Sequence, residues 1–323
     1  MKKFIIGIDV GGTSIKFGLV KNNKIYHEFS LPTFAFENPK KVLSQVQLGI
    51  SQFLKQVSSN QIEGIGIGFP GKVDAEKGIV TSAPNFNNWK NVQVSKKLIK
   101  FGYPVFIDND ANCAALGELF FGRGRKIKSF VMVTLGTGVG GGLILNGKLF
   151  RGESGGAGEI GHITIDYSGP YCKCGKRGCI EAYAGNNYIK QRTIQKLHEY
   201  PDSLILQLVE HNLENIEPKI INEAAKKGDE LAIKILRETG YYIGIGLANI
   251  ANILDVKHFI IGGGVSNAGP VLLKAIENSI KEHGIKEIVK DVKVISAQLK
   301  NKAGILGASS LVLSNQKRKW KKF

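Results

Sequence analysis

The sequence has no apolar stretch long enough to cross a membrane, and it contains little cysteine. No uninterrupted apolar run approaches the length of about 18 residues that a membrane helix requires. The N-terminus has a basic start but lacks the apolar core and the small-residue cleavage site of a signal peptide. Four cysteines in 323 residues are too few for a disulfide scaffold. These absences argue against a membrane or secreted protein, and we expect a soluble protein of the cytoplasm.

Acidic residues are also scarce relative to basic ones. The chain has 27 Asp and Glu against 44 Lys and Arg, and its formal net charge is +17. Such a charge invites binding to nucleic acid. However, the basic residues are spread along the chain, apart from the run between Lys317 and Lys322, and no helix-turn-helix, RNA-binding aromatic motif or zinc-finger helix accompanies them. We therefore expect no nucleic-acid partner, a basic surface that attracts phosphorylated ligands, and a frayed C-terminal end.

The length and the spacing of apolar residues predict two α/β domains. Hydrophobic residues make up 43% of the chain, enough for two cores. A strand-glycine-strand pattern opens both halves, at residues 4–20 and 129–145, as a weak internal duplication. The spacing elsewhere predicts strands over 24–29, 62–69, 105–108, 148–151, 259–261 and 292–295, and helices over 39–57, 92–100, 112–120, much of 184–250, 271–282 and 303–313.

Two glycine turns follow strands of similar pattern, Asp9-Val-Gly11-Gly12-Thr13 and Leu135-Gly-Thr137-Gly138-Val-Gly140-Gly. Glycine lets backbone N–H groups approach a phosphate closely, the threonine hydroxyl adds a donor, and Asp9 suits Mg²⁺ held through water. Two tight hairpins without a ligand are the alternative. The dinucleotide-type and P-loop-type glycine spacings at residues 66–72 and 136–148 are rejected, since no helix follows and Val73 and Leu149 replace the metal-binding hydroxyl residue.

Three cysteines and one histidine lie close together in the middle of the chain: His162, Cys172, Cys174 and Cys179. Three thiols cannot all pair as internal disulfides, whereas three thiolates and one imidazole complete a tetrahedral zinc shell with no open position. The zinc is therefore expected to be structural. The spacing Cys172-x-Cys174 is tighter than in a zinc finger, and the remaining Cys113 is typical of an ordinary buried thiol.

Several motifs occur in an order that resembles the ROK family (repressors, open reading frames and sugar kinases), bacterial glucokinases among them. They are Asp9-x-Gly-Gly-Thr13, Pro84-Asn85, Asn109-Asp110-x-Asn112, Leu135-Gly-Thr-Gly-x-Gly140, Gly158-Glu-x-Gly-His162 and Cys172-x-Cys-Gly-x-x-Gly-Cys-x-Glu181. The resemblance covers nearly the whole chain and implies an actin-like (ribonuclease H-like), two-lobed α/β ATPase fold with a cleft between the lobes. It implies a smaller lobe of residues 1–118 with the helix 303–323 returning to it, a larger lobe of residues 119–302, and a homodimer or homotetramer.

The resemblance further implies ATP-dependent phosphorylation of glucose at O6, with Mg²⁺ and a structural Zn²⁺. Asp110 would be the general base, and a helix N-cap is its alternative role. The family's sugar-contacting positions match Gly68, Asn85, Asn109, Asp110, Glu159, His162 and Glu181. Its nucleotide positions match Asp9, Gly11, Gly12, Thr13, Lys16, Thr137, Gly138, Gly140, Gly262, Gly263 and Gly264.

Structural alternatives stand beside these roles. Asn85 also fits a turn, the glutamates fit solvated surface positions, Gly68 fits a strand end, Lys16 fits a solvent-facing position, and residues 262–264 fit a strand-to-helix turn.

Other functions compete within and beyond this class. Another hexose or an N-acetylhexosamine (N-acetylglucosamine, N-acetylmannosamine, fructose or allose) could be the substrate, and polyphosphate could be the donor. A sugar-responsive repressor of the family would carry a DNA-binding domain before the first strand, whereas the first strand here begins at Phe4. A sugar sensor without catalysis would not need Asp9, Asp110 and both glycine turns. We therefore expect a sugar kinase.

Overall fold

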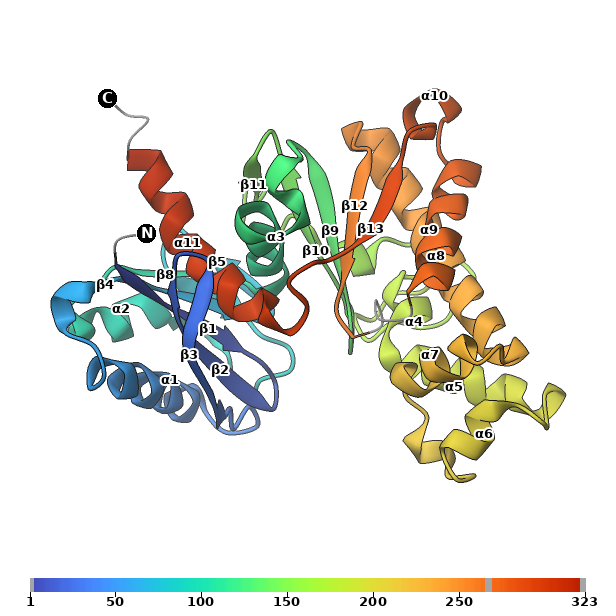
Figure 1. Ribbon diagram of the computed structural model, residues 1–323, viewed down its shortest axis with the longest axis horizontal. Helices are drawn as coiled ribbons and strands as arrows, with labels where there is room; N and C mark the ends of the chain where they lie inside the picture. Colours follow the sequence, from blue (N-terminus) through green and yellow to red (C-terminus); the bar gives the residue numbers. More distant parts are fainter. Residues whose placement is uncertain (1–2, 265–268, 320–323) are drawn as a thin grey trace. The chain divides into compact units, whose positions relative to one another are not determined.

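The computed structural model describes residues 3–264 and 269–319, and it divides into two compact units (Figure 1). Unit 1 comprises the chain up to Lys128, the segment Gly142–Ala157 and the chain from Gln298 onward. Unit 2 comprises Ser129–Gly141 and Gly158–Ala297. Val265 and Ser266, which directly follow the expected nucleotide-binding glycines 262–264, lie outside the described residues, as does the end of the basic C-terminal run. Within the described part of the chain, no helix is both long and apolar enough to cross a membrane.

Unit 1 is built on a five-stranded sheet with the order β3-β2-β1-β4-β8. Its strands are β1 (Phe4–Val10), β2 (Ser14–Lys21), β3 (Lys24–Pro32), β4 (Ile62–Phe69) and β8 (Val105–Asn109). The first three form the predicted antiparallel meander, with Asn22 and Asn23 at φ 49° and 65° in the turn between β2 and β3. β4 and β8 continue the sheet parallel to β1. The strand predictions for this sheet are confirmed.

Helix α1 (Pro39–Leu54) covers a core that it shares with this sheet. Asn38 caps the helix by accepting from Lys41 N at 3.2 Å, and Pro39 occupies the first turn, where its missing N–H costs nothing. Val42, Val46 and Ile50 recur at helical spacing and are fully buried. Burial of each such side chain stabilises the fold by about 1.5–3 kcal/mol. The helix ends at Leu54, before the predicted end at residue 57.

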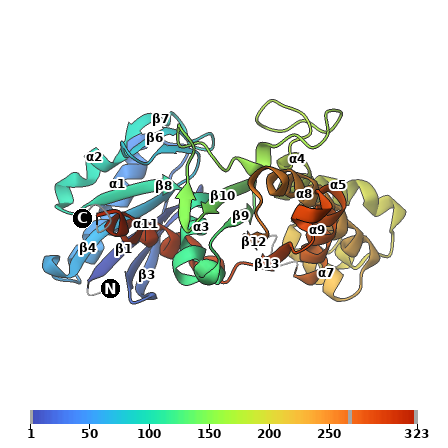
Figure 2. The same ribbon diagram turned by 90° about the horizontal axis from the view of Figure 1, so that it is seen from above.

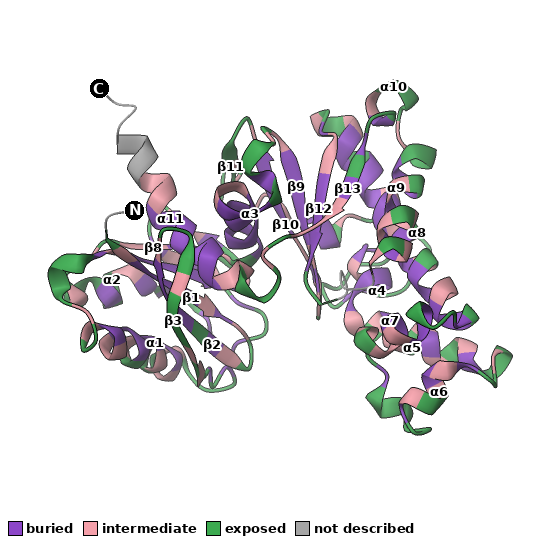
Figure 3. Ribbon diagram, in the orientation of Figure 1, coloured by how far each residue is buried: buried purple, intermediate pink, exposed green. Residues whose placement is uncertain are grey.

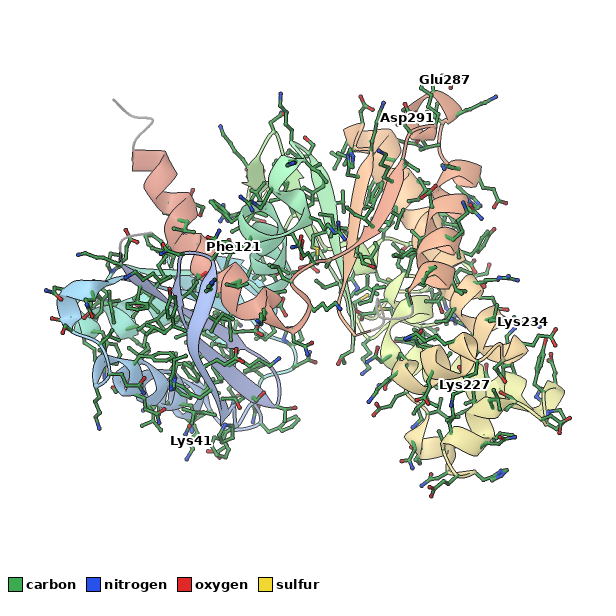
Figure 4. The ribbon with its side chains drawn as sticks, in the orientation of Figure 1. Lys41, Phe121, Lys227, Lys234, Glu287 and Asp291 are labelled. Carbon is green, nitrogen blue, oxygen red and sulfur yellow. The ribbon has the colours of Figure 1, made fainter. Side chains whose placement is uncertain are left out.

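Helix α11 (Ala303–Lys319) returns to unit 1 near the end of the chain and lies directly on β1 and β4. A Cβ atom on Gly7 or on Gly66 would collide with backbone atoms of this helix, so the strands can approach it only at glycine. On its other side the helix packs against α3 (Asp110–Phe121), where Phe121, labelled in Figure 4, joins an apolar cluster with Ile305 and Leu306.

A small antiparallel sheet in unit 1 was not predicted. It consists of β5 (Lys72–Asp74), β6 (Ile79–Ser82) and β7 (Lys90–Gln93), and it is followed by the short helix α2 (Val94–Leu98). The predicted helix over 92–100 is therefore wrong at its start. Each of these strands buries essentially one valine, Val73, Val80 or Val92, so the sequence offers no extended period-2 pattern.

The second five-stranded sheet has the order β11-β10-β9-β12-β13. Its strands are β9 (Phe130–Leu135), β10 (Val139–Leu145), β11 (Lys148–Phe150), β12 (His258–Gly262) and β13 (Lys293–Ser296). β9, β12 and β13 run parallel, and their apolar residues are almost all buried (Figure 3). The predicted Asn146-Gly147 turn joins β10 to β11 with φ values of 51° and 72°. The chain passes from unit 2 to unit 1 within β10.

Helices form most of the remainder of unit 2, as predicted. They are α4 (Glu181–Ala184), α5 (Asn186–Lys196), α6 (Leu204–Leu208), α7 (Pro218–Lys226), α8 (Glu230–Leu254), α9 (Pro270–His283) and α10 (Lys286–Val289). The long helix α8 lies beside α9 (Figures 1 and 2). Gly240 and Gly244 of α8 face Ala275 and Ser279 of α9, and a Cβ atom at either glycine would force the helices apart.

Candidate functional site

The carboxyl ends of three parallel strands bring the predicted acidic residues of unit 1 to one edge of its sheet. Asp9 of β1 lies opposite Gly68 of β4, and Gly68 lies opposite Asp108 of β8. The turn at Gly11 and Gly12 therefore leaves the sheet at the same edge as the start of α3. This edge of an open α/β sheet is where ligands commonly bind.

Asp9 is held in a partly buried position at this edge. Burial raises the pKa of its carboxyl group above the ordinary value of 3.8, while the positive charge of Lys16, its partner on β2, acts in the opposite direction. The first turn of α11 approaches so closely that a Cβ atom on Gly304 would collide with the Asp9 carboxylate. The turn itself is fixed by Thr33, which donates to Gly11 O at 2.7 Å. Thr13 and Lys16 are exposed.

The N-cap of α3 is Asn109 and not Asp110, so the alternative role weighed for Asp110 is wrong. Asn109 Oδ1 accepts from Ala111 N at 2.9 Å and from Asn112 N at 3.1 Å, and its Nδ2 donates to Gly71 O at 3.0 Å. Asp110 is the first residue of the helix and is exposed. Asn109 therefore has a clear structural role, and its sugar contact stays a prediction.

A buried ion pair beside Asp110 was missed from the sequence. Asp108 is 1% exposed and accepts from Arg151 Nε at 2.8 Å and Nη2 at 2.7 Å. Asn112 Nδ2 donates to the same carboxylate at 2.9 Å. This ion pair, in which two guanidinium nitrogens of Arg151 contact Asp108, fixes the junction of β8 and α3 to the loop that starts at Arg151 and leads toward Glu159. Nothing in the local sequence marks Arg151, because its partner lies 43 positions away.

In unit 2 the second glycine turn and the glycines that follow β12 lie at one sheet edge. Thr134 of β9 lies opposite Gly262 of β12, so the turn at Gly136–Gly138 and the glycines after β12 emerge side by side, and Gly140 lies in β10. Gly263 has φ +87°, and a Cβ atom there would collide with Leu135 O. Glycine is therefore required by both conformation and space. Thr137 is exposed in the neighbouring turn.

The N-terminus of α5 adds a feature that the sequence analysis did not identify. Asn186 N donates to Gly136 O at 3.0 Å, which places the start of this 11-residue helix against the second glycine turn. Asn186 Oδ1 is buried and has no hydrogen-bond partner among the described residues. Helix N-termini beside glycine turns favour phosphate groups, because their N–H groups and their dipole attract negative charge. The Gly185-Asn186 pair at the start of a largely polar helix was the sequence feature from which this helix N-terminus could have been predicted.

Glu181 links the glycine turn to the cysteine-rich loop. Its Oε2 accepts from Val139 N at 3.0 Å, and its Oε1 lies 3.8 Å from Cys172 Sγ. Gly138 makes room for this carboxylate, since a Cβ atom there would collide with it. One carboxylate oxygen of Glu181 is thus already hydrogen-bonded within the protein, and the contact of Glu181 with the sugar stays a prediction.

The four predicted metal ligands come together in unit 2. The nearest ligand atoms of His162, Cys172, Cys174 and Cys179 all lie within 4.8 Å of one another. Cys174 Sγ is 3.6 Å from Cys179 Sγ, and Cys172 Sγ is 3.8 Å from His162 Nδ1. A tetrahedral shell with bonds of about 2.3 Å has edges of about 3.8 Å, so the donor set fits Zn²⁺. His162 directs Nδ1 to the cluster, which leaves Nε2 for another partner.

The protonation of these thiols depends on their local surroundings. Burial raises the pKa of Cys172 to about 12, whereas a backbone N–H from Lys176 lowers the pKa of Cys174. A bound zinc ion would displace the thiol protons.

The remaining predicted sugar residues are Asn85 and Gly68 in unit 1 and Glu159 in unit 2, and of these Gly68 lies near the end of β4. Asn85 is exposed within the turn closed by the hydrogen bond from Phe86 N to Ala83 O in unit 1, and Gly68 is buried beside Cys113 and Asp110. Glu159 is exposed just before the short 3-10 turn Ile160–His162 in unit 2. Each unit therefore carries its own part of the predicted set.

Comparison with known proteins gives full-length matches. The model of the ROK family matches residues 5–315. A glucokinase of Thermotoga maritima is 35% identical over 311 residues, which cover 95% of this chain and 96% of the relative. A xylose repressor of Caldicellulosiruptor bescii is 34% identical over 96% of this chain and 78% of its own length. The structure of a ROK family glucokinase from Streptomyces griseus, in complex with glucose and AMPPNP, matches with a TM-score of 0.83 at 35% identity, covering 97% of this chain and 99% of that one.

Proposed function

The chain belongs to the ROK family and has its two-lobed, actin-like α/β fold, and from this premise we propose that it is an ATP-dependent sugar kinase that phosphorylates glucose at O6. The observation that carries the proposal is the strand register of unit 1. It brings the phosphate-type turn after Asp9 and the exposed carboxylate after Asn109 to one sheet edge. Phosphoryl transfer requires the phosphate-binding turn and the carboxylate that acts on the acceptor to lie close together.

Asp110 is the proposed general base. Its carboxylate accepts the proton of the sugar 6-hydroxyl as that oxygen bonds to the γ-phosphorus and the bond to the β-phosphate oxygen breaks. Asn109 and the Asp108–Arg151 pair hold the start of α3, so they orient Asp110 without touching the reacting atoms. ADP and the sugar phosphate are the products.

The glycine turns are the proposed binding elements for ATP and Mg²⁺. Asp9 would hold Mg²⁺, which when bound neutralises the charge of the phosphates. Gly12 and Thr13 would supply backbone N–H groups and a hydroxyl for the phosphates. Gly11 would shape the turn, since its N–H donates to Ser14 O at 3.0 Å. In unit 2, Thr137, Gly138 and Gly140 would bind phosphate in the same way, while Gly262, Gly263 and Gly264 would border the adenosine.

Sugar contacts are proposed for residues of each unit, taken separately. In unit 1 the proposed sugar-binding residues are Gly68, Asn85 and Asn109, the last through its amide. In unit 2 they are Glu159, His162 and Glu181. Their amide and carboxylate groups suit vicinal hydroxyls, because they form two hydrogen bonds in one plane. The zinc ion would be structural and would fix the loop that bears His162 and Glu181. Glucose is favoured because the glucokinase relatives match this chain over nearly its whole length.

A coupled assay of ADP release over a panel of hexoses and N-acetylhexosamines tests the proposal. We expect the highest kcat/KM with glucose, and a fall in turnover of about 10²–10⁴-fold in Asp110→Ala. Asp202→Ala, which removes an exposed carboxylate of unit 2, serves as the matched control and should keep normal turnover.

Near-normal turnover of folded, zinc-loaded Asp110→Ala would contradict the general-base role. Faster turnover of an N-acetyl sugar would replace glucose as the substrate. Sugar binding without any turnover would instead identify a sensor, a relevant outcome because a repressor also matches most of this chain.

A further inference from the structure

Three helices of unit 2 line a groove that contains none of the residues proposed above. The groove lies between α5, α8 and α9 and has a volume of about 860 Å³. Binding sites for small molecules commonly have volumes of about 300–1,000 Å³, so a phosphorylated monosaccharide fits this space. Figure 4 shows the side chains of these helices.

The charged side chains of the groove carry an excess of positive charge. Four cations face two carboxylates, and the six residues are Arg192, Lys196, Arg237, Lys274, Glu238 and Glu282. Glu238 is shared, since it lies 2.8 Å from Lys196 Nζ and 3.5 Å from Arg192 Nε. Within residues 3–264 and 269–319, neither Arg237 nor Lys274 forms an ion pair. Two cations are therefore available to a ligand.

Arg192 is a largely buried cation at the base of this set. Its side chain is 15% exposed, and it donates from Nη1 to Tyr183 O at 2.7 Å and from Nη2 to Thr239 Oγ1 at 2.6 Å. Arg192 Nε is buried without a hydrogen bond among the described residues. Burial also lowers the pKa of Arg192, because a buried charge loses its hydration. An anion in the groove would offset that loss.

The uncharged lining suits a sugar. Tyr241 and Tyr242 offer aromatic surface for the ring, and the amides of Gln195 and Asn278 suit its hydroxyl groups. We propose that this groove is a second ligand site, which binds a phosphorylated monosaccharide, the chemical class of the product of the proposed reaction. The regulatory part of this inference rests on the proposed function.

A direct chain of contacts connects the groove to the proposed sugar residues. The ring of Tyr242 stacks on that of Tyr183 with centroids 4.0 Å apart, and Arg192 bonds the backbone of the same residue. Tyr183 also donates to Asp166 Oδ2 at 2.8 Å, just before the cysteine-rich loop. Tyr183 and Glu181 belong to the same four-residue helix, α4. Occupancy of the groove therefore changes the apparent KM for the sugar more than it changes kcat.

Isothermal titration calorimetry tests the site with glucose 6-phosphate as the probe. The full chain is first saturated with glucose and AMPPNP, so that the proposed catalytic site is filled. We expect binding to the wild type, and binding weakened about tenfold or more in Arg237→Ala/Lys274→Ala, because each lost charge removes a charge-assisted contact. Lys286→Ala/Lys290→Ala, with the same loss of charge on and just after α10, should bind like the wild type. In kinetic assays, added glucose 6-phosphate should shift the KM for glucose of the wild type by more than that of the groove variant, in which only product inhibition at the catalytic site remains.

Three results would overturn the proposal. They are no binding to the saturated wild type, equal binding by the groove variant, and equal affinity for inorganic phosphate and glucose 6-phosphate. The groove variant could also bind glucose 6-phosphate as tightly as the wild type but have a different sedimentation coefficient. That result would assign the groove to contact between copies of the chain. A second titration without glucose and AMPPNP separates the two hypotheses. If no sugar is phosphorylated but the groove variant still loses binding, the proposed function fails and the site stands.

Discussion

At the edge of the first sheet, some residues hold the local structure, and a neighbouring residue is the one proposed to take part in the chemistry. Asn109 caps α3, and Asp108 is buried in a two-pronged pair with Arg151, which leaves Asp110 exposed as the carboxylate that can meet a substrate. A buried carboxylate without its partner costs about 3–5 kcal/mol, so Asp108 and Arg151 depend on each other. Two acidic residues separated by one position thus have different surroundings, one buried and paired and the other exposed.

Asp9 provides a prediction about pH at this scale. Because burial raises the pKa of its carboxyl group, the folded chain binds this proton more tightly than the unfolded chain. The wild type therefore loses stability as the pH rises from the unfolded pKa through the folded one. Asp9→Asn removes this cost. We expect its free energy of unfolding to exceed that of the wild type by more at pH 7 than at pH 4, while turnover falls about 10²-fold.

Urea denaturation at both pH values and the coupled kinase assay check this prediction. Asp74→Asn is the control, because the pKa of Asp74 is lowered by a backbone N–H of Lys77, and its difference from the wild type should have the opposite trend with pH. A pH-independent difference for Asp9→Asn would contradict the assignment of a buried, proton-retaining carboxylate.

At the scale of elements, loops and helix ends are fixed by groups from distant parts of the chain. Glu118 of α3 is fully buried and accepts from Arg123 N at 2.7 Å, from Gln298 N at 2.8 Å and from Leu299 N at 2.9 Å. One carboxylate thereby anchors the chain where it enters α11. In unit 2 the cysteine-rich loop has a comparable anchor if zinc binds its four ligands.

Loss of one metal ligand is therefore a sharp test of this loop. We expect Cys174→Ser to lose its zinc, and the KM for the sugar to rise about 10- to 100-fold, because Glu181 and His162 lose a fixed support. Metal analysis of the purified protein and sugar kinetics measure both effects. Cys113→Ala, which removes a thiol outside the cluster, should retain the metal. Full zinc content in Cys174→Ser, or unchanged sugar kinetics in a zinc-free protein, would contradict the structural role.

At the scale of the whole molecule, the net charge of +17 distinguishes the two proposed substrates. A positive field attracts ATP, which is an anion, but does not act on a neutral hexose. Raising the salt concentration from about 0.05 M to about 0.5 M shortens the Debye length from about 14 Å to about 4 Å.

We therefore expect the KM for ATP to rise about threefold or more over this range, while the KM for glucose changes by less than about twofold. Initial rates at constant free Mg²⁺ measure both constants. Equal shifts in the two constants would show that salt acts on the fold or on catalysis rather than through long-range attraction of ATP.

The sequence by itself determined most elements and the composition of the sites. Apolar runs followed closely by glycine predicted strands such as β4 and β9. The residue types of Asn146-Gly147 predicted the turn there. The four metal ligands were also identifiable, because they lie close together along the chain. These features depend on local preferences, which a short stretch of sequence contains.

Only the tertiary structure decided which distant residues meet. The register of β1, β4 and β8 aligns Asp9 with Asp108, and the pairing of Asp108 with Arg151 joins segments that share no local pattern. The small sheet β5-β6-β7 and the cationic groove between α5, α8 and α9 arise in the same way. Their formation depends on the packing of elements far apart in the chain, and the free energy of that packing is not encoded in any single segment.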